Sequence, residues 1–198
     1  MHKLTNLPPE YNFDDPAILR ALNLASRALA ELKGESKTIT NSDILINTLS
    51  LQESKESSEI ENIVTTQDDL FKSQIDEGIK NIAAKEVKQY AAALLHGYKL
   101  INQHQLLTSN HILEIQAILE PNKSGFRKLM GTALKNSTGE VVYLPPQNPQ
   151  DIIELMSNLD KYINLPELHD VDPLIKMAII HHQFESIHPF YDGNGRTG

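Results

Sequence analysis

An aspartate or asparagine is followed directly by proline at three places in the sequence, and these pairs constrain the fold most. They are Asp15-Pro16, Asn148-Pro149 and Asp172-Pro173. An Asp or Asn side chain caps the free N–H groups at the start of a helix, and proline fits the first turn because it has no N–H to leave unpaired. Each pair predicts a helix that begins at its proline, so the chain should be mostly α-helical.

Apolar residues recur at helical spacing after each pair. The first stripe contains Ile18, Leu22, Ala25, Leu29 and Leu32, and Gly34 should end its helix. The second stripe contains Ile152, Met156, Leu159 and Ile163, and the third contains Leu174, Met177, Ala178, His181 and Phe184. We expect His181 to be a hydrogen-bonded core residue. Other stripes predict a helix that begins at Asn41 or Ser42, a long helix from Ile75 to Leu94, and a helix capped by Ser109 or Asn110.

One segment interrupts the helical pattern. Residues 136–139 have the composition of a tight turn, and the β-prone residues 141–144 follow them. Pro145 and Pro146 cannot donate ladder hydrogen bonds, so the second strand should be short. We therefore predict a β-hairpin between residues 124 and 146.

Composition limits the class of protein. A chain of 198 residues, 40% of them apolar, can bury one core, so we expect one domain with at most a small appendage. The net charge is −8 and there is no basic stripe, which argues against nucleic acid as a partner. The sequence has no cysteine, no signal-peptide core and no apolar run of about 18 residues, so we expect a cytoplasmic protein without a membrane segment.

Residues 187–198 contain the highest concentration of chemically active side chains. They include an imidazole, a carboxylate, an amide and a guanidinium, together with two glycines. Pro189 cannot continue a helix, because it lacks an N–H and its ring clashes with the preceding turn. The helix before it should therefore end near His188 and leave that imidazole at the mouth of a loop.

The loop itself has the residues of a phosphate site. Gly193 and Gly195 allow a tight turn close to a ligand, and a helix that begins after them would direct free N–H groups at an anion. Asp192 would repel that anion unless a cation such as Mg²⁺ lies between them. Arg196 adds a forked donor suited to phosphate. We predict a nucleotide-phosphate site with a base at its edge.

Residues 188–196 resemble the signature of the Fic family, His-x-Phe-x-(Asp/Glu)-Gly-Asn-Gly-Arg-x-x-Arg, at every specified position up to Arg196. The final arginine of the signature would fall at position 199. We therefore expect the chain to continue beyond Gly198, with the Fic core truncated at that end. The resemblance implies a mostly α-helical Fic-type core with a β-hairpin flap.

A second motif lies earlier in the chain. Ser57, Glu61 and Asn62 fit Ser/Thr-x-x-x-Glu-(Gly/Asn), which is similar to the inhibitory motif of Fic proteins. Ser58 and Glu61 also have the spacing of a helix capping box, so a purely structural role stays open. The resemblance divides the chain into an N-terminal helical extension with the inhibitory motif, residues 1–95, and the Fic core, residues 96–198.

The resemblance also implies a reaction, in which Fic adenylyltransferases use ATP and Mg²⁺ to transfer AMP to a Ser, Thr or Tyr hydroxyl of a target protein. His188 would be the catalytic base, a role that suits an imidazole with a pKa near neutrality. Asp192 would hold Mg²⁺ and Arg196 would take phosphate charge. The α- and β-phosphates would bind at Gly193, Asn194 and Gly195.

Further expectations concern the hairpin and regulation. The hairpin would lie over the nucleotide, with Val142 and Tyr143 in the wall of the site, and would dock the target by strand pairing. Glu61 would inhibit the enzyme by pairing with the arginine expected at position 199. The family also implies self-modification and a homodimer.

Other functions stay open at this point. Transfer of phosphate or phosphocholine occurs within the same fold, although Gly195 stands where Doc-type proteins typically have lysine. Removal of AMP from a protein would use Glu61 to align a water. Outside catalysis, the alternative is a module that binds nucleotide or protein without turnover.

Overall fold

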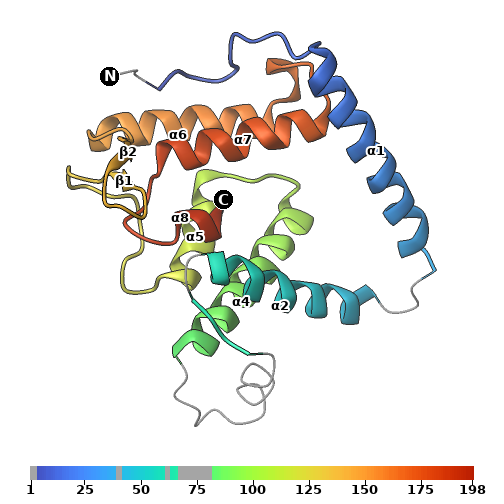
Figure 1. Ribbon diagram of the computed structural model, residues 1–198, viewed down its shortest axis with the longest axis horizontal. Helices are drawn as coiled ribbons and strands as arrows, with labels where there is room; N and C mark the ends of the chain where they lie inside the picture. The colour runs from blue at the N-terminus through green and yellow to red at the C-terminus, as the bar shows by residue number, and fades with distance from the viewer. Residues whose placement is uncertain (1–3, 39–41, 61–62, 67–81) are drawn as a thin grey trace. The chain divides into compact units, whose positions relative to one another are not determined.

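The computed structural model describes residues 4–38, 42–60, 63–66 and 82–198. The described chain is mostly helical with one two-stranded antiparallel sheet, which confirms the predicted fold class (Figure 1). The chain forms two compact units: residues 1–42 with 127–189, and residues 43–126 with 190–198. None of the described helices is long and apolar enough to cross a bilayer.

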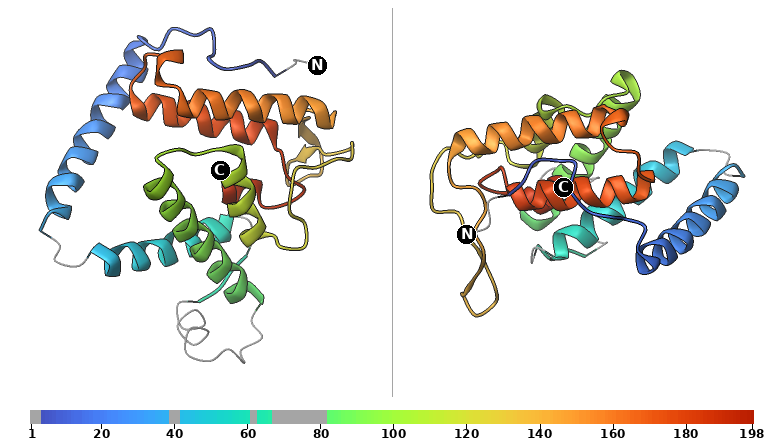
Figure 2. Two further views of the ribbon diagram at one scale, coloured as in Figure 1. Left: turned by 180° about the vertical axis from the view of Figure 1, so that it is seen from behind. Right: turned by 90° about the horizontal axis from the view of Figure 1, so that it is seen from above.

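The first unit is built on two helices that lie side by side, α6 (Pro149–Asn164) and α7 (Pro173–Ile187), as both Figure 1 and Figure 2 show. The short 3-10 helix η1 (Pro166–Leu168) connects them, and α1 (Pro16–Ser36) contacts α7. Asp15, Asn148 and Asp172 each accept a backbone N–H in the first turn of the helix that follows. All three predicted helix starts are therefore confirmed.

The core of this unit lies mainly on α6. Its buried residues are Ile152, Leu155, Met156, Leu159 and Tyr162. The predicted stripe is thus correct except at its end, where Tyr162 is buried and Ile163 is only half-buried. On α7 the buried residues are Gln183, Phe184 and Ile187. The expectation that His181 lies in the core is wrong, because the buried face of α7 turns away from it and leaves it exposed.

Helix α1 differs from its prediction in two ways. It continues through Gly34 to Ser36, since one glycine costs a helix only about 1 kcal/mol. None of its residues is buried, and Leu29 and Leu32 are 51% and 60% exposed. The apolar spacing therefore predicted the helix correctly but not the burial of its stripe.

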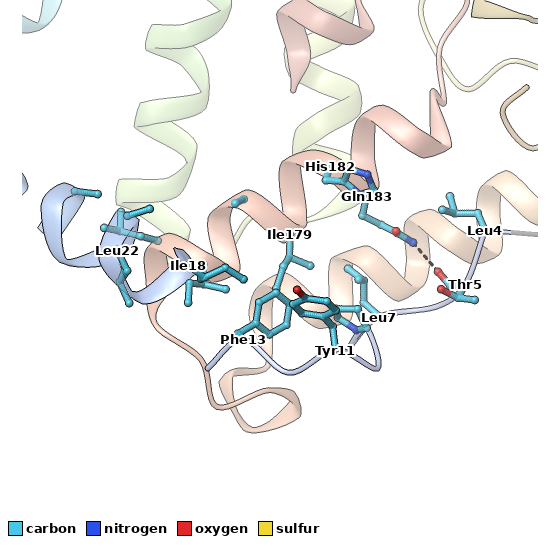
Figure 3. Close-up of a pocket in the computed structure, with 16 residues that line it drawn as sticks. Leu4, Thr5, Leu7, Tyr11, Phe13, Ile18, Leu22, Ile179, His182 and Gln183 are labelled. Carbon is cyan, nitrogen blue, oxygen red and sulfur yellow. Dashed lines mark hydrogen bonds between the residues drawn. The ribbon is translucent and has the colours of Figure 1, made fainter. Parts of the chain in front are cut away.

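A cavity of about 680 Å³ lies between the N-terminal segment, the start of α1 and α7 (Figure 3). Its wall is apolar, and Tyr11, Phe13 and Ile179 lie near one another in it. Gln183 also lines the cavity, and its Nε2 donates to the Thr5 carbonyl at 2.9 Å.

The predicted hairpin is present. Strand β1 (Leu134–Lys135) pairs antiparallel with β2 (Val141–Tyr143). The turn is closed by Asn136, whose Oδ1 accepts the N–H groups of Thr138 and Glu140 at 3.1 and 2.9 Å. The second strand ends before the two prolines, as expected.

The second unit contains α2 (Ser42–Ile60), α4 (Ile82–His104), α5 (Ser109–Leu119) and α8 (Asn194–Thr197). Helices α4 and α5 pack closely at Gly97, where an added Cβ would lie 2.9 Å from Ile115 Cδ1. Thr108 caps α5, one residue before Ser109 and two before Asn110, which were the predicted caps. Helix α8 contacts α5.

The apolar face expected on the long third helix is partly wrong. The residues of α4 that are buried are Ala84, Val87, Tyr90, Ala93 and Gly97. Ile82 and Leu94, which the prediction placed on the same face, are exposed. Ile75 and Ile79 lie outside the described residues. This face packs against Leu51 of α2 at Ala84 and Val87, and against α5 at Tyr90 and Ala93.

Candidate active site

Helix α7 ends where the sequence predicts, at Ile187, and His188 is its C-cap. His188 adopts the left-handed conformation, with φ 49° and ψ 59°, and its N–H donates to the Phe184 carbonyl. Residues with a Cβ rarely adopt this conformation, so the surrounding structure must hold it. The imidazole is half-buried.

Two side chains from the hairpin region donate to the end of α7. Tyr143 Oη donates to the Ser186 carbonyl at 2.9 Å. Arg127 Nε donates to the His188 carbonyl at 2.8 Å, and its Nη2 donates to the Ile187 carbonyl at 3.4 Å. The last carbonyls of a helix lack intrahelical donors, so these bonds supply what the helix cannot.

The surroundings of His188 favour the neutral form of its imidazole. Burial lowers the pKa of His188, and the nearby Arg127 guanidinium lowers it further, while an interaction with the backbone of Glu185 acts in the opposite direction. A neutral imidazole can accept a proton, so the environment suits a general base.

In the second unit, residues 190–193 form a tight loop that leads into α8. Phe190 is fully buried, and its ring packs against Phe126 with centroids 5.6 Å apart. Asn194 is also buried, and its side chain bonds both backbone groups of Phe190: Oδ1 accepts the N–H at 2.9 Å and Nδ2 donates to the carbonyl at 3.0 Å. The amide predicted to bind phosphate therefore closes the loop in this structure.

Helix α8 begins at Asn194, between the two glycines and not after both of them as predicted. Gly193 is its N-cap, with φ 75°, and an added Cβ would lie 3.2 Å from Glu120 Cγ. Gly195 lies inside α8 and is exposed. Of these two glycines, Gly193 is therefore the one that needs to be glycine for its backbone conformation.

Arg196 is tightly held beneath the loop. Its side chain is only 4% exposed, and Nη2 lies 2.8 Å from Glu120 Oε1 and 3.7 Å from Asp192 Oδ1. The sequence predicted a phosphate ligand here, but it gave no sign of Glu120 as a partner. Glu120 is the last residue before Pro121 at the end of α5, a position with no recognisable motif.

Asp192, the predicted Mg²⁺ ligand, forms an ion pair with a lysine side chain. Lys123 Nζ lies 2.7 Å from its Oδ2, and both side chains are partly exposed. Burial raises the pKa of Asp192, but the hydrogen bond and charge of Lys123, with smaller contributions from Gly193 and Arg196, lower it below its ordinary value overall. An ionised, accessible carboxylate fits Mg²⁺, which typically takes one or two carboxylates together with phosphate oxygens and water. The described residues contain no cluster of three or more His, Asp or Glu that could hold a metal alone.

Gln116 organises the loop that carries Lys123. It is fully buried on α5, accepts the Gly125 N–H at 3.1 Å and donates to the Lys123 carbonyl at 3.3 Å and the Asp192 carbonyl at 3.5 Å. Sequence reasoning missed Gln116, because a glutamine within an apolar helix has no specific signal.

The hairpin residues differ in exposure. Val142 is 63% exposed, while Tyr143 is half-buried. A cavity of about 610 Å³ lies beside the base of the hairpin, and its wall includes Met130, Tyr143 and Leu144.

The predicted inhibitory motif is described only in part. Ser57 lies near the C-terminal end of α2, and its Oγ donates to Glu53 Oε1 at 2.7 Å. Glu61 and Asn62 lie outside the described residues. The capping-box alternative is wrong, because Ser58 lies within the last turns of α2 and not at a helix start.

Two family models match most of the chain. The model of the Fic/DOC family N-terminal region matches residues 19–99, and the Fic/DOC family model matches residues 106–198. Protein adenylyltransferase fic-1 of Caenorhabditis briggsae is 29% identical over 106 residues, which are 50% of this chain and 20% of the relative. Protein adenylyltransferase Fic of Aedes aegypti is 27% identical over 158 residues, 76% of this chain and 28% of the relative. The chain thus spans less than a third of the length of these two relatives.

Solved structures share the fold. A Fic family protein from Desulfovibrio desulfuricans G20 has a TM-score of 0.71 and 22% identity, covering 96% of this chain and 56% of that one. A fragment of Fic-1 from Caenorhabditis elegans has a TM-score of 0.65 and 21% identity, covering 91% of this chain and 57% of that one. The two family matches, the signature and the fold agree, and the chain therefore belongs to the Fic/DOC family.

Proposed function

We propose that this protein is an adenylyltransferase, which transfers AMP from ATP to a Ser, Thr or Tyr hydroxyl of a target protein. The observation that carries the proposal is the unbroken signature from His188 to Arg196 in a chain whose relatives are named protein adenylyltransferases. Nucleotidyl transfer needs mainly positioning and charge stabilisation, so a short set of residues is enough for it.

His188 is the proposed base. The target oxygen forms a bond to the α-phosphorus, the bond from that phosphorus to pyrophosphate breaks, and His188 accepts the hydroxyl proton. The lowered pKa of His188 supports this role, since an imidazole that is already protonated cannot accept that proton.

The loop is the proposed phosphate site. Asp192 would hold Mg²⁺, which supplies positive charge next to the phosphates when it is bound. Backbone N–H groups at Gly193 and Gly195 would donate to phosphate oxygens, and Arg196 would take further charge. Asn194 would contribute by keeping the loop closed, because its side chain bonds Phe190.

The hairpin is the proposed docking site for the target. The sheet has only two strands, so each has an edge at which a target segment can pair, and Val142 on β2 is exposed. Val142 and Tyr143 would then form one wall of the ATP site. We include self-modification and a homodimer in the proposal on the resemblance alone.

Inhibition through Glu61, flanked by Ser57 and Asn62, is the proposed regulation. Its support is the motif and its place ahead of the signature. A carboxylate that pairs with a phosphate-binding arginine would compete with the terminal phosphate of ATP.

Labelled ATP tests the proposal. We expect label from the α-phosphate on the target protein or on the protein itself, with more label for Glu61→Gly and none for His188→Ala. Equal labelling by His188→Ala would overturn the assignment of the base. Label that arrives from the γ-phosphate would instead indicate phosphate transfer.

A further inference from the structure

Arg127 is an unexpected residue in the first unit. It lies between Phe126 and the hairpin, and the sequence around it gives no motif, yet its side chain is only 1% exposed. Burying a guanidinium is costly unless its N–H groups find acceptors. The acceptors described for Arg127 lie at the end of α7, at Pro189 shortly after it, and at the base of the hairpin.

The bonds of Arg127 surround His188. Its Nε donates to the His188 carbonyl at 2.8 Å, Nη2 donates to the Ile187 carbonyl at 3.4 Å, and its own backbone N–H donates to the Pro189 carbonyl at 2.8 Å. One residue thus holds three successive carbonyls, including those on both sides of the His188 backbone. A positive charge at this place is also favourable, because the C-terminus of a helix carries partial negative charge.

The backbone conformation of His188 explains why these bonds affect the position of its imidazole. In the left-handed conformation the Cβ leaves the chain in a direction that ordinary helical backbone would not give, and the imidazole follows the Cβ. If the carbonyls of Ile187 and His188 rotated, the peptide planes around His188 would turn and the ring would move. Nη2 of Arg127 also donates to the Pro146 carbonyl, so the same guanidinium ties this backbone to the base of the hairpin.

We propose that Arg127 is a positioning residue for His188, which fixes its left-handed backbone through the adjacent carbonyls and couples it to the hairpin. The inference rests on the proposed function, because it takes His188 to be the base. Arg127 is not a catalytic residue in this account, since its Nε, its Nη2 and its backbone N–H donate to carbonyls of the protein backbone.

The charge of Arg127 has a second effect that can be measured separately. After burial, this guanidinium is the second cause that lowers the pKa of His188, while Glu185, the nearest charged residue before it on α7, acts on the imidazole through its backbone. Lysine keeps a positive charge but cannot reproduce the planar fork of arginine. Arg127→Lys therefore removes mainly the positioning, whereas Arg127→Met removes the positioning and the charge.

The test measures AMP transfer by the intact protein over a range of pH and follows the His188 imidazole by NMR titration. For Arg127→Lys we expect kcat to fall about 10- to 100-fold, with KM for ATP and the acidic limb of the pH profile unchanged. For Arg127→Met we expect at least the same fall in kcat, with the acidic limb and the NMR titration of His188 moved to higher pH. Lys128→Met, at the exposed neighbouring residue, should behave as wild type.

A role confined to folding would reduce the folded fraction without changing kcat per folded molecule or the titration of His188, and that result would overturn the proposal. Wild-type kcat for Arg127→Lys would do the same. Should Arg127→Met fail to fold, the kcat of Arg127→Lys per folded molecule decides. Should His188→Ala retain AMP transfer, the assignment of His188 as the base fails, but the titration of His188 in the Arg127 variants still shows whether Arg127 acts on it.

Discussion

Asn158 and Asn194 make the same pair of hydrogen bonds in two regions of the molecule. Asn194 accepts the N–H of Phe190 and donates to its carbonyl, four residues away. Asn158 on α6 accepts the N–H of Leu7 at 2.7 Å and donates to its carbonyl at 3.0 Å, across 151 positions of sequence. Each amide thus satisfies both backbone groups of one buried residue.

The two regions differ in what happens when such a bond is broken. The loop around Asn194 is enclosed by buried side chains, including Phe190 and Arg196, so its backbone groups cannot reach water easily. The N-terminal segment lies beside an open cavity and leads into α1, which has no buried residue. A segment of this kind can open locally, and its opening free energy limits the cost of any change in it. The same pair of hydrogen bonds should therefore contribute more to the free energy of unfolding in the loop around Asn194 than in the N-terminal segment.

The largest expected effect comes from the ion pair under the loop. Glu120→Ala would leave the nearly buried Arg196 without its closest carboxylate, so we expect the free energy of unfolding to fall by about 3–5 kcal/mol. Chemical denaturation measures this, with Glu167→Ala in the exposed η1 as the control. A loss for Glu120→Ala as small as that of the control would show that the loop is not rigidly enclosed.

Asn194→Ala tests the loop itself. It would leave the N–H and the carbonyl of Phe190 unsatisfied inside the protein, at a cost of about 1–3 kcal/mol for each group. We also expect AMP transfer to be lost, because the loop no longer closes. Denaturation measures the loss of stability, and the labelling assay measures AMP transfer. If Asn194→Ala kept the stability and the AMP transfer of wild type, the loop would not depend on Asn194 more than the N-terminal segment depends on Asn158.

Two glycines sharpen the comparison of loop and N-terminal helix. Gly193→Ala forces an alanine into φ 75° and towards Glu120 Cγ, so we expect a loss of about 1–2 kcal/mol. Gly34→Ala lies in α1 with no atom within 4 Å of the new Cβ, so it should stabilise by about 0.5–1 kcal/mol. Opposite signs in thermal denaturation are the expected result, and equal signs would contradict it.

Asn158→Ala should have a smaller effect than Asn194→Ala. We expect a loss of about 1 kcal/mol, because the N-terminal segment can move into water instead of burying unsatisfied groups. Amide exchange at Leu7 should become faster, while exchange at Phe190 should not change. Faster exchange at both amides would show that the two regions open together.

The smallest effect should come from the exposed pair of Lys123 and Asp192. Because the pKa of Asp192 lies below its ordinary value of 3.8, its contribution to stability is present above that value and is lost as pH falls through the lowered pKa. Lys123→Met should weaken this acid dependence, and high salt should weaken it in wild type too. Unfolding free energy as a function of pH, at low and high salt, measures both. No difference between Lys123→Met and wild type would show that the pair contributes nothing.

The parts of the site that sequence reasoning found are those whose reasons are local. His188 ends a helix because Pro189 follows it, and Gly193 adopts a positive φ within its own turn. The partners of the site were missed: Arg127, Glu120 and Gln116 lie 61 to 76 residues from the groups they bond in the signature. Nothing in their own neighbourhoods marks them, because their roles exist only after the chain has folded.

The sequence by itself determined the starts of α1, α6 and α7, the hairpin, the signature and the family, because caps, turn residues and motif spacing act over a few neighbouring residues. Only the tertiary structure decided that the stripe on α1 stays exposed, that His181 faces out and that Asn194 closes the loop. Burial and long-range hydrogen bonds depend on which segments meet, and periodicity within one segment carries no information about its partner.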